Sequence, residues 1–226
     1  MQPRKTLLRR YLGSLVWILP LTLGALCWMT YPFADAISVK HLSMSGLSAQ
    51  QKANIELAAQ TINGHVLQPG ETFSFNAIVG PREAGRGYKP APSYLGPDSP
   101  STMGGGICLL SSTLYQAVLE AGCDVTERVP HLRTVHSVPP GLDAAVWYGQ
   151  ADLKFKNTLK VPIQICTDWS GNKLSVKVLG KEENSESIEL RRRITKESPD
   201  SIVVELYRLR DAAETLVSRD VYRTTQ

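Results

Sequence analysis

The chain has 226 residues, 42% of them hydrophobic and 20% charged, a composition that excludes an intrinsically disordered protein. The length fits one domain with an appendage. The formal net charge of +4 equals the charge of the four basic residues in the first ten positions, Arg4, Lys5, Arg9 and Arg10, so the rest of the chain is neutral. We therefore expect no nucleic-acid partner.

An uncharged segment, residues 12–31, follows this basic start. As a helix rising ~1.5 Å per residue it is long enough to cross a hydrocarbon core of ~30 Å. Positive charge before the span predicts a cytoplasmic N-terminus and an extracytoplasmic remainder. We expect a single-pass protein of the cell membrane, anchored by residues 1–36. In the alternative, Ala34-Asp35-Ala36 is a signal-peptide cleavage site and the domain is secreted.

The chain after this segment predicts a mixed α and β domain. Ser48 and Gln51 have capping-box spacing at the start of a predicted helix over 48–63. Apolar residues at helical spacing predict a second helix over 108–121. Between the helices, the Gly- and Pro-rich stretch 65–107 predicts loops that shape a site, with short strands at 72–79 and 88–95.

Alternating and β-branched residues predict strands in the second half of the chain. The expected pairs are 161–165 with 174–178 around the turn 168–172, and 202–209 with 215–222 as a C-terminal β-hairpin after a charged linker at 181–200. We predict an α+β fold: a single compact domain with a Gly-rich loop leading into a central helix, and mostly antiparallel strands. The predicted divisions are 1–36 (anchor), 37–180 (domain) and 181–226 (linker and C-terminal extension).

Three consecutive glycines, Gly104–Gly106, precede Cys108 at the start of the second predicted helix. Glycine lets the backbone approach a ligand closely. N–H groups at a helix N-terminus stabilise a thiolate or a developing oxyanion. Cys108 is therefore a candidate nucleophile. The alternative is a buried structural cysteine, because free cysteine is among the most buried residue types.

A nucleophilic cysteine needs a base and a group that orients the base. His131 and Asp143 follow in loop segments, and the order Cys, His, Asp is similar to that of papain- and transglutaminase-type hydrolases. His136 is a rival base, and disulfides involving Cys108, Cys123 or Cys166 are a structural alternative. The chain contains neither a Cys-x-x-Cys nor a His-x-x-x-His pair, so we expect no metal and no cofactor.

Residues 72–180 resemble the VanW family. The matching segments are Thr72–Asn76, Val79–Arg82, Gly87-Tyr88, residues 104–122 (GGGICLLSSTLYQAVLEAG), Glu127-Arg128, His131, Val138–Gly141, Asp143-Ala144 and Tyr148–Asn157. The tail, with Glu205–Arg208 and Tyr222-Arg223, is similar to the β extension that often follows this domain.

The resemblance implies an exported or membrane-tethered envelope protein that associates with peptidoglycan or its precursors. The family takes its name from a glycopeptide (vancomycin) resistance gene cluster. The family pattern supports Cys108, His131 and Asp143 as the positions of interest. Leu109 stands where the family usually has Gln, and Val129 where it often has His.

Two hypotheses of function follow. The first is a non-catalytic module that binds peptidoglycan or a wall precursor; its ligand-binding residues would be Gly104, Gly105, Gly106, Ser111, Ser112, Tyr88 and Tyr148, with Tyr94 and Trp147 as further stacking faces. The second is a cysteine-dependent acyl-transfer enzyme acting on wall peptides. In it Cys108 attacks, His131 serves as base and Asp143 orients the histidine. The sequence indicates no oligomeric state.

Overall fold

The structure, a computed structural model, describes residues 32–93, 101–135, 137–181 and 187–224. Nearly all of the predicted anchor, residues 1–36, lies outside these ranges. In the part of the chain that is described, no helix is both long and apolar enough to cross a membrane. The described residues form an α+β fold in which the strands of every sheet pair antiparallel.

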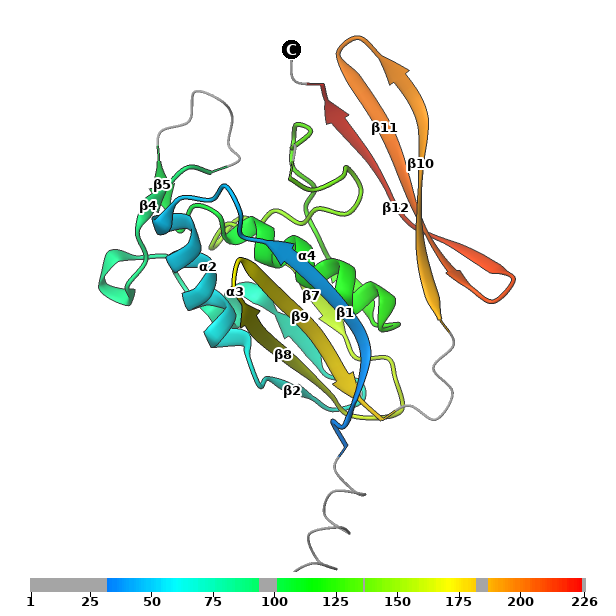
Figure 1. Cartoon of the computed structure of the whole chain (residues 1–226). Coiled ribbons are helices and arrows are strands. Elements are labelled where there is room, and N and C mark those ends of the chain that lie inside the picture. Colours follow the sequence, from blue (N-terminus) through cyan, green and yellow to red (C-terminus); the bar gives the residue numbers. More distant parts are fainter. Residues whose placement is uncertain (1–31, 94–100, 136, 182–186, 225–226) are drawn as a thin grey trace, which may run out of the picture.

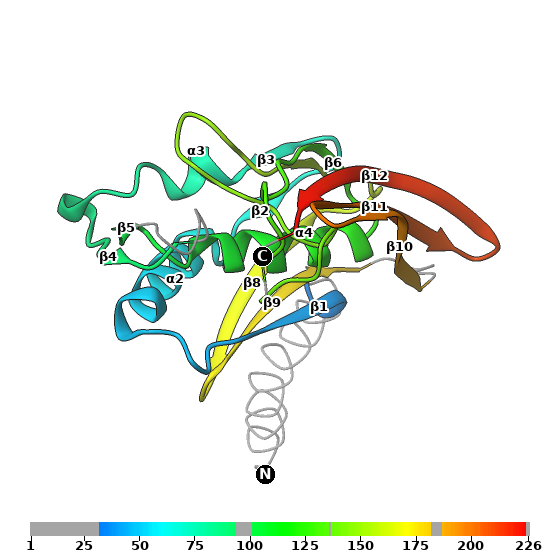
Figure 2. The ribbon, with the colours of Figure 1, turned by 90° about the horizontal axis from the view of Figure 1, so that it is seen from above.

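Helix α4 (Ile107–Glu120) lies at the centre of the molecule and confirms the predicted second helix. It is apolar on almost every side, with Leu110, Leu114 and Val118 completely buried. A helix that is apolar on all sides is stable only when other elements bury it on all sides. A four-stranded sheet covers one side and a three-stranded sheet the opposite side, as the view from above shows (Figure 2).

The four-stranded sheet has the order β1-β9-β8-β2. Its strands are β1 (Asp35–Ser43), β2 (Val66–Leu67), β8 (Ile163–Ser170) and β9 (Lys173–Gly180). The predicted β8–β9 hairpin is confirmed, with a tighter turn at Gly171-Asn172. Helix α2 (Ala49–Ile62) packs on β8 and on α4, and its predicted capping box between Ser48 and Gln51 is present.

The three-stranded sheet has the order β3-β7-β6, formed by β3 (Thr72–Ser74), β6 (Asp124–Glu127) and β7 (Lys154–Lys156). The predicted strand over 72–79 is wrong beyond Ser74. The Ser74 hydroxyl accepts a hydrogen bond from the Ala77 amide and caps the short helix α3 (Phe75–Val79). The remaining elements are a 3₁₀ turn at Ala84–Arg86 and the two-residue strands β4 (Pro90–Ala91) and β5 (Thr102–Met103).

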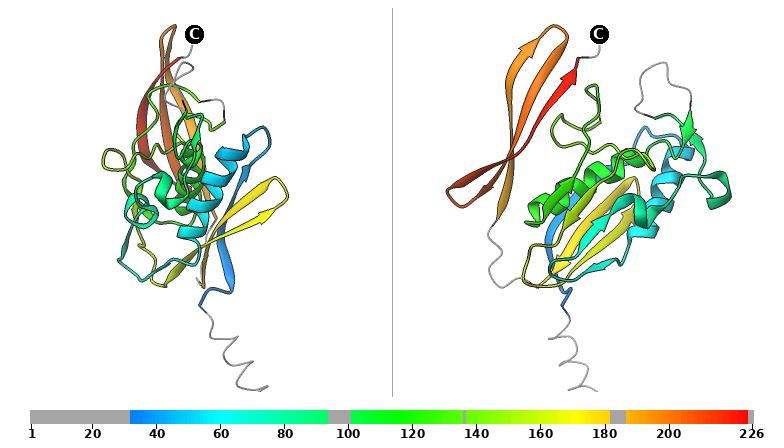
Figure 3. Two further views of the ribbon diagram at one scale, coloured as in Figure 1. Left: turned by 90° about the vertical axis from the view of Figure 1, so that its left-hand side faces the viewer. Right: turned by 180° about the vertical axis from the view of Figure 1, so that it is seen from behind.

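The predicted C-terminal hairpin of 202–209 with 215–222 is confirmed, and a third strand, which was not predicted, extends it to a three-stranded sheet. It consists of β10 (Ile188–Ser198), β11 (Ser201–Arg210) and β12 (Ala213–Arg223) in that order (Figures 1 and 3). Most of the predicted linker at 181–200 is strand β10. Its charged side chains are those of an exposed edge strand, which is why the segment resembles a linker. The completely buried Leu206 of β11 joins the sheet to the main core.

Candidate functional site

Cys108 is the second residue of α4. The helix begins after Gly106, whose φ of 98° is left-handed and suits glycine. The Cys108 thiol is partly exposed, and its Sγ lies 3.5 Å from the amide nitrogen of Val146 and 3.7 Å from the Val146 oxygen. The first-turn N–H groups of a helix have no acceptor within the helix and favour negative charge. The thiol therefore lies at the end of α4 that favours negative charge.

The glycine run is required by close packing. A Cβ on Gly105 would lie 2.2 Å from the backbone oxygen of Ala91, so no other residue fits without a shift of strand β4. The run also reaches the site, because Gly104, Gly105 and Gly106 all line the cavity in front of Cys108.

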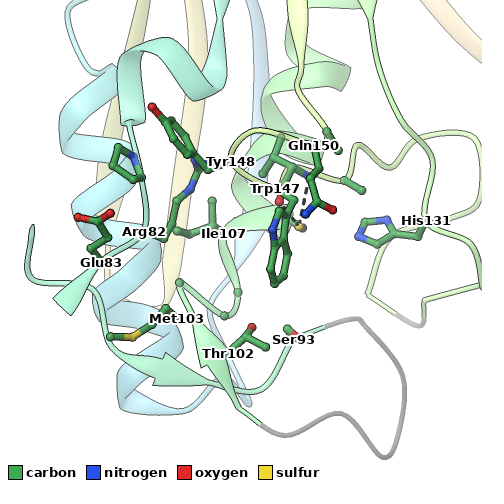
Figure 4. A pocket seen from close by; sticks show the side chains of 18 residues that line it. Arg82, Glu83, Ser93, Thr102, Met103, Ile107, His131, Trp147, Tyr148 and Gln150 are labelled. Atoms are coloured by element: carbon green, nitrogen blue, oxygen red, sulfur yellow. Dashed lines mark hydrogen bonds between the residues drawn. The ribbon is translucent and has the colours of Figure 1, made fainter.

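A cavity of about 570 Å³ opens over the start of α4. Cys108 and His131 line it together, with the indole of Trp147 and the phenol of Tyr148 on the rim (Figure 4). These two aromatic side chains are 43% and 51% exposed. Figure 4 shows the His131 ring on the opposite side of the cavity from Arg82, turned towards Gln150 and Trp147. The cavity thus presents a thiol, an imidazole and stacking faces to one bound molecule.

His131 and Asp143 form a short, buried pair. The Nδ1 atom of His131 lies 2.6 Å from Oδ2 of Asp143, and the His131 backbone amide donates to the same oxygen at 2.7 Å. Burial alone raises the pKa of Asp143, but the hydrogen bond to His131 and the charge of Arg128 outweigh burial and lower it to about 2. Asp143 is therefore a carboxylate at neutral pH, as an orienting group must be.

The imidazole of His131 is coupled to both neighbours. Burial lowers the pKa of His131, but hydrogen bonds to Asp143 and Cys108, together with their charges, raise it to about 9. Because Nδ1 is engaged by Asp143, Nε2 is the ring nitrogen left to face the thiol. With a pKa of about 9, His131 carries its second proton at neutral pH and lies as a cation beside the Cys108 thiol.

The second carboxylate oxygen of Asp143 is held by residues that the sequence did not single out. Oδ1 accepts from Arg128 Nη2 at 2.8 Å and from the Tyr222 hydroxyl at 2.6 Å. Arg128 is in turn paired with Asp220 at 2.5 Å. A usable signal was present: Arg128 and Tyr222 lie in segments that resemble the family. Nothing local shows that strand β12 reaches the site.

The serines next to Cys108 face the protein interior. Ser111 Oγ donates to the Ala144 oxygen at 2.6 Å, and Ser112 Oγ accepts from the Ala144 amide at 2.9 Å. Both are completely buried, and neither lines the cavity. They join helix α4 to the segment that carries Asp143. Tyr88 is also buried and lies away from the cavity lining, whereas Tyr148 lines it.

The structure brings together Cys108, His131 and Asp143, the three residues predicted from their order and the resemblance. The rival base His136, like Tyr94, lies outside the described residues. His41 bonds Ser175 in the four-stranded sheet, and His65 packs edge-on against Phe73.

In the described part of the chain Cys108, Cys123 and Cys166 form no disulfide, which is contrary to the disulfide alternative. Within the described ranges no three His, Cys, Asp or Glu side chains are grouped so as to hold a metal ion.

The chain matches known proteins over this same region. Residues 50–179, more than half of the chain, match the family model described as "VanW like protein". The chain is 41% identical over 145 residues to the "Uncharacterized protein YoaR" of Bacillus subtilis (strain 168), covering 60% of this chain and 48% of that protein. It is 30% identical over 126 residues to the "Vancomycin B-type resistance protein VanW" of Enterococcus faecalis (strain ATCC 700802 / V583), covering 54% and 46%.

The chain therefore spans about half the length of the curated relatives it matches. No solved structure matches it. The matched segment contains Cys108, His131 and Asp143 and ends before the C-terminal sheet begins. The chain belongs to the VanW family.

Proposed function

We propose that this protein is a cysteine-dependent acyl-transfer enzyme, a hydrolase or transpeptidase, acting on cell-wall peptides. One observation carries the proposal: Cys108 and His131 line the same cavity, and the His131 ring is fixed by a 2.6 Å hydrogen bond to Asp143. A nucleophile at a helix start, a base and an orienting carboxylate are the three parts that such an enzyme requires.

The chemistry divides into two steps. The Cys108 thiolate attacks the carbonyl carbon of a peptide amide, and the developing oxyanion is stabilised by the N–H groups at the start of α4. The His131 imidazolium gives its proton to the leaving amine nitrogen, the C–N bond breaks, and a thioester remains. Water or a second amine then attacks the thioester and gives a proton to His131, and the thiolate leaves.

The wall-peptide substrate and the location belong to the proposal. A relative that is 30% identical is named a vancomycin resistance protein, which supports a role at the cell wall. The basic start and the uncharged segment 12–31 support a single-pass location in the cell membrane, with the site outside. The alternative of secretion after signal cleavage leaves the chemistry unchanged.

The proposal is tested by trapping the thioester. The full-length protein is mixed with synthetic peptidoglycan stem peptides, and the reaction is quenched in acid. The protein is then digested, and the mass of the peptide that contains Cys108 is measured by mass spectrometry. We expect an acyl adduct on Cys108 that is lost in Cys108→Ala and kept in the matched control Cys166→Ala, since Cys166 lies in β8 away from the cavity. Stem peptides left intact, without an adduct at any time point, would overturn it.

A second candidate is a module that binds wall material without chemistry. The exposed Trp147 and Tyr148 on the cavity rim favour it, because such rings stack on ligands. In that case Cys108→Ala binds stem peptides as tightly as the native chain does, whereas Trp147→Ala binds them more weakly. The native chain does not convert the stem peptides.

A further inference from the structure

Strand β12 of the C-terminal sheet reaches the site from outside the segment that matches the family. The end of the strand pairs with the residues directly after His131: the Arg223 amide donates to the Leu132 oxygen at 2.9 Å, and the Thr134 amide donates to the Arg223 oxygen at 3.2 Å. The loop that carries His131 is thus joined to β12 by main-chain hydrogen bonds.

The same strand also holds Asp143. The hydroxyl of Tyr222 donates to Asp143 Oδ1 at 2.6 Å, and it accepts from the Gly141 amide at 2.7 Å. Tyr222 therefore touches both the carboxylate and the turn that leads to it. Burial raises the pKa of Tyr222, the Arg128 charge opposes this only in part, and the hydroxyl keeps its proton as a donor.

A neighbour in β12 acts on the same carboxylate through an arginine. Asp220 accepts from Arg128 Nη1 at 2.5 Å, and Arg128 uses Nη2 on Asp143 Oδ1 and Nε on the Asp143 backbone oxygen at 2.6 Å. The side chains of Arg128 and Asp220 are only 5% and 9% exposed. Asp220 fixes the guanidinium in the plane that reaches Asp143.

These contacts exceed what attachment of the sheet requires. Apolar side chains such as Leu206 already fasten it to the core. Burying a phenol hydroxyl and a carboxylate costs free energy unless each is fully hydrogen-bonded. The Tyr222 hydroxyl bonds Asp143, Arg128 and the Gly141 amide in the turn beside Asp143. The Asp220 carboxylate accepts from Arg128 and from Ser218.

We infer that Tyr222 is a positioning residue that holds the carboxylate of Asp143 in the orientation that His131 requires, so that the site is complete only with the C-terminal sheet in place. The inference deepens the proposed function and rests on it for its catalytic meaning. The geometry it claims is measurable without any substrate.

The experiment follows the His131 Nδ1–H proton by NMR in the full-length chain, with its resonance assigned by loss in His131→Gln. A proton in a short, buried hydrogen bond gives a downfield signal that exchanges slowly with water. We expect exchange about tenfold faster in Tyr222→Phe, the factor that corresponds to losing one net hydrogen bond. Tyr207→Phe, which removes a hydroxyl bonded to Glu205 in the same sheet, is the matched control and keeps the native rate.

Asp220→Asn is a second variant, which keeps the shape of the side chain while weakening its hold on Arg128. We expect this variant, too, to exchange the His131 Nδ1–H proton with water faster than the native chain does. Native exchange in both variants, or no protected signal in the native chain, overturns the inference. Faster exchange in Tyr222→Phe together with no acyl adduct on Cys108 in the native chain would sustain the positioning role and reject the enzyme, so the two proposals fail separately.

Discussion

Asp143 accepts two hydrogen bonds on each carboxylate oxygen, and the shortest contact to His131 joins Oδ2 to Nδ1 at 2.6 Å. The side chains are 1% and 9% exposed, so both charges are withdrawn from water and depend on each other. The pair should therefore affect the stability of the fold as well as the chemistry of the site, and the two effects can be measured separately.

Replacing Asp143 with Asn keeps the shape and removes the charge. The His131 imidazolium then loses its buried counter-ion, and Arg128 loses one of its two, Asp220 being the other. Breaking such a pair costs about 3–5 kcal/mol of unfolding free energy. The measurement is denaturant unfolding. The control is Asp168→Asn, whose ion pair with Lys177 is half exposed and should cost no more than about 1 kcal/mol. Equal losses in the two variants would show that Asp143 is not a buried counter-ion.

The pKa of His131 predicts how stability depends on alkaline pH. The folded value of about 9 lies above the ordinary value of 6.5, so this stabilisation is fully present below pH 6.5 and is lost as the pH rises through about 9. We expect the unfolding temperature to fall between pH 7 and pH 10, and the fall to be smaller in His131→Gln. An identical pH profile in the two chains would contradict the raised pKa.

The same titration predicts the pH dependence of the chemistry. The leaving amine needs the proton that the His131 imidazolium carries, so formation of the acyl adduct on Cys108 should slow as the pH rises through about 9. Stopped reactions at pH 7 and pH 10 with the same stem peptide measure it. If the acyl adduct forms faster at pH 10 than at pH 7, His131 does not supply the proton.

Local signals made the two long helices predictable. Ser48 and Gln51 cap α2 within four residues of sequence, and the apolar spacing of α4 needs no distant partner. The alternating Phe73-Ser74-Phe75 reads equally well as strand, and only the Ser74 cap distinguishes the start of α3. Strand β10 was missed because an exposed edge strand carries charges where a buried one carries apolar residues.

The site was predictable only in part, for a similar reason. Cys108 directly follows the glycine run, and His131 and Asp143 belong to segments that resemble the family. Tyr222 bonds Asp143 from 79 residues away, and no local pattern encodes such a contact. Ser111 and Ser112 were predicted to bind a ligand. Their inward orientation depends on how the Asp143–Ala144 segment packs on α4.

The glycine run gives a prediction about packing. In Gly105→Ala the new methyl group would lie 2.2 Å from the backbone oxygen of Ala91. Because this oxygen belongs to the main chain, it cannot avoid the methyl group by a side-chain rotation. Overpacking of this kind costs about 1–3 kcal/mol or more. Gly85→Ala is the control, because a Cβ there meets nothing within 4 Å and φ is not left-handed. Comparable unfolding midpoints for both variants would mean that strand β4 moves away freely.

The Ser112 hydroxyl gives the last prediction, which separates a structural link from a ligand contact. Oγ donates to the Cys108 oxygen at 2.6 Å and accepts from the Ala144 amide at 2.9 Å, so Ser112→Ala leaves a buried amide without its acceptor. The expected loss of unfolding free energy is about 1–3 kcal/mol. Thr61→Ala, an exposed hydroxyl on α2, should change it by no more than about 0.5 kcal/mol.

Because Ser112 joins Cys108 to the residue after Asp143, its loss should also change the site. Acyl transfer by Ser112→Ala should slow more than binding of stem peptides weakens, since the hydroxyl does not face the cavity. Binding by the Cys108→Ala and the Cys108→Ala, Ser112→Ala chains, compared by calorimetry, isolates the second effect. A large loss of affinity in the double variant would place the hydroxyl at the ligand and return Ser112 to the role that the sequence first indicated.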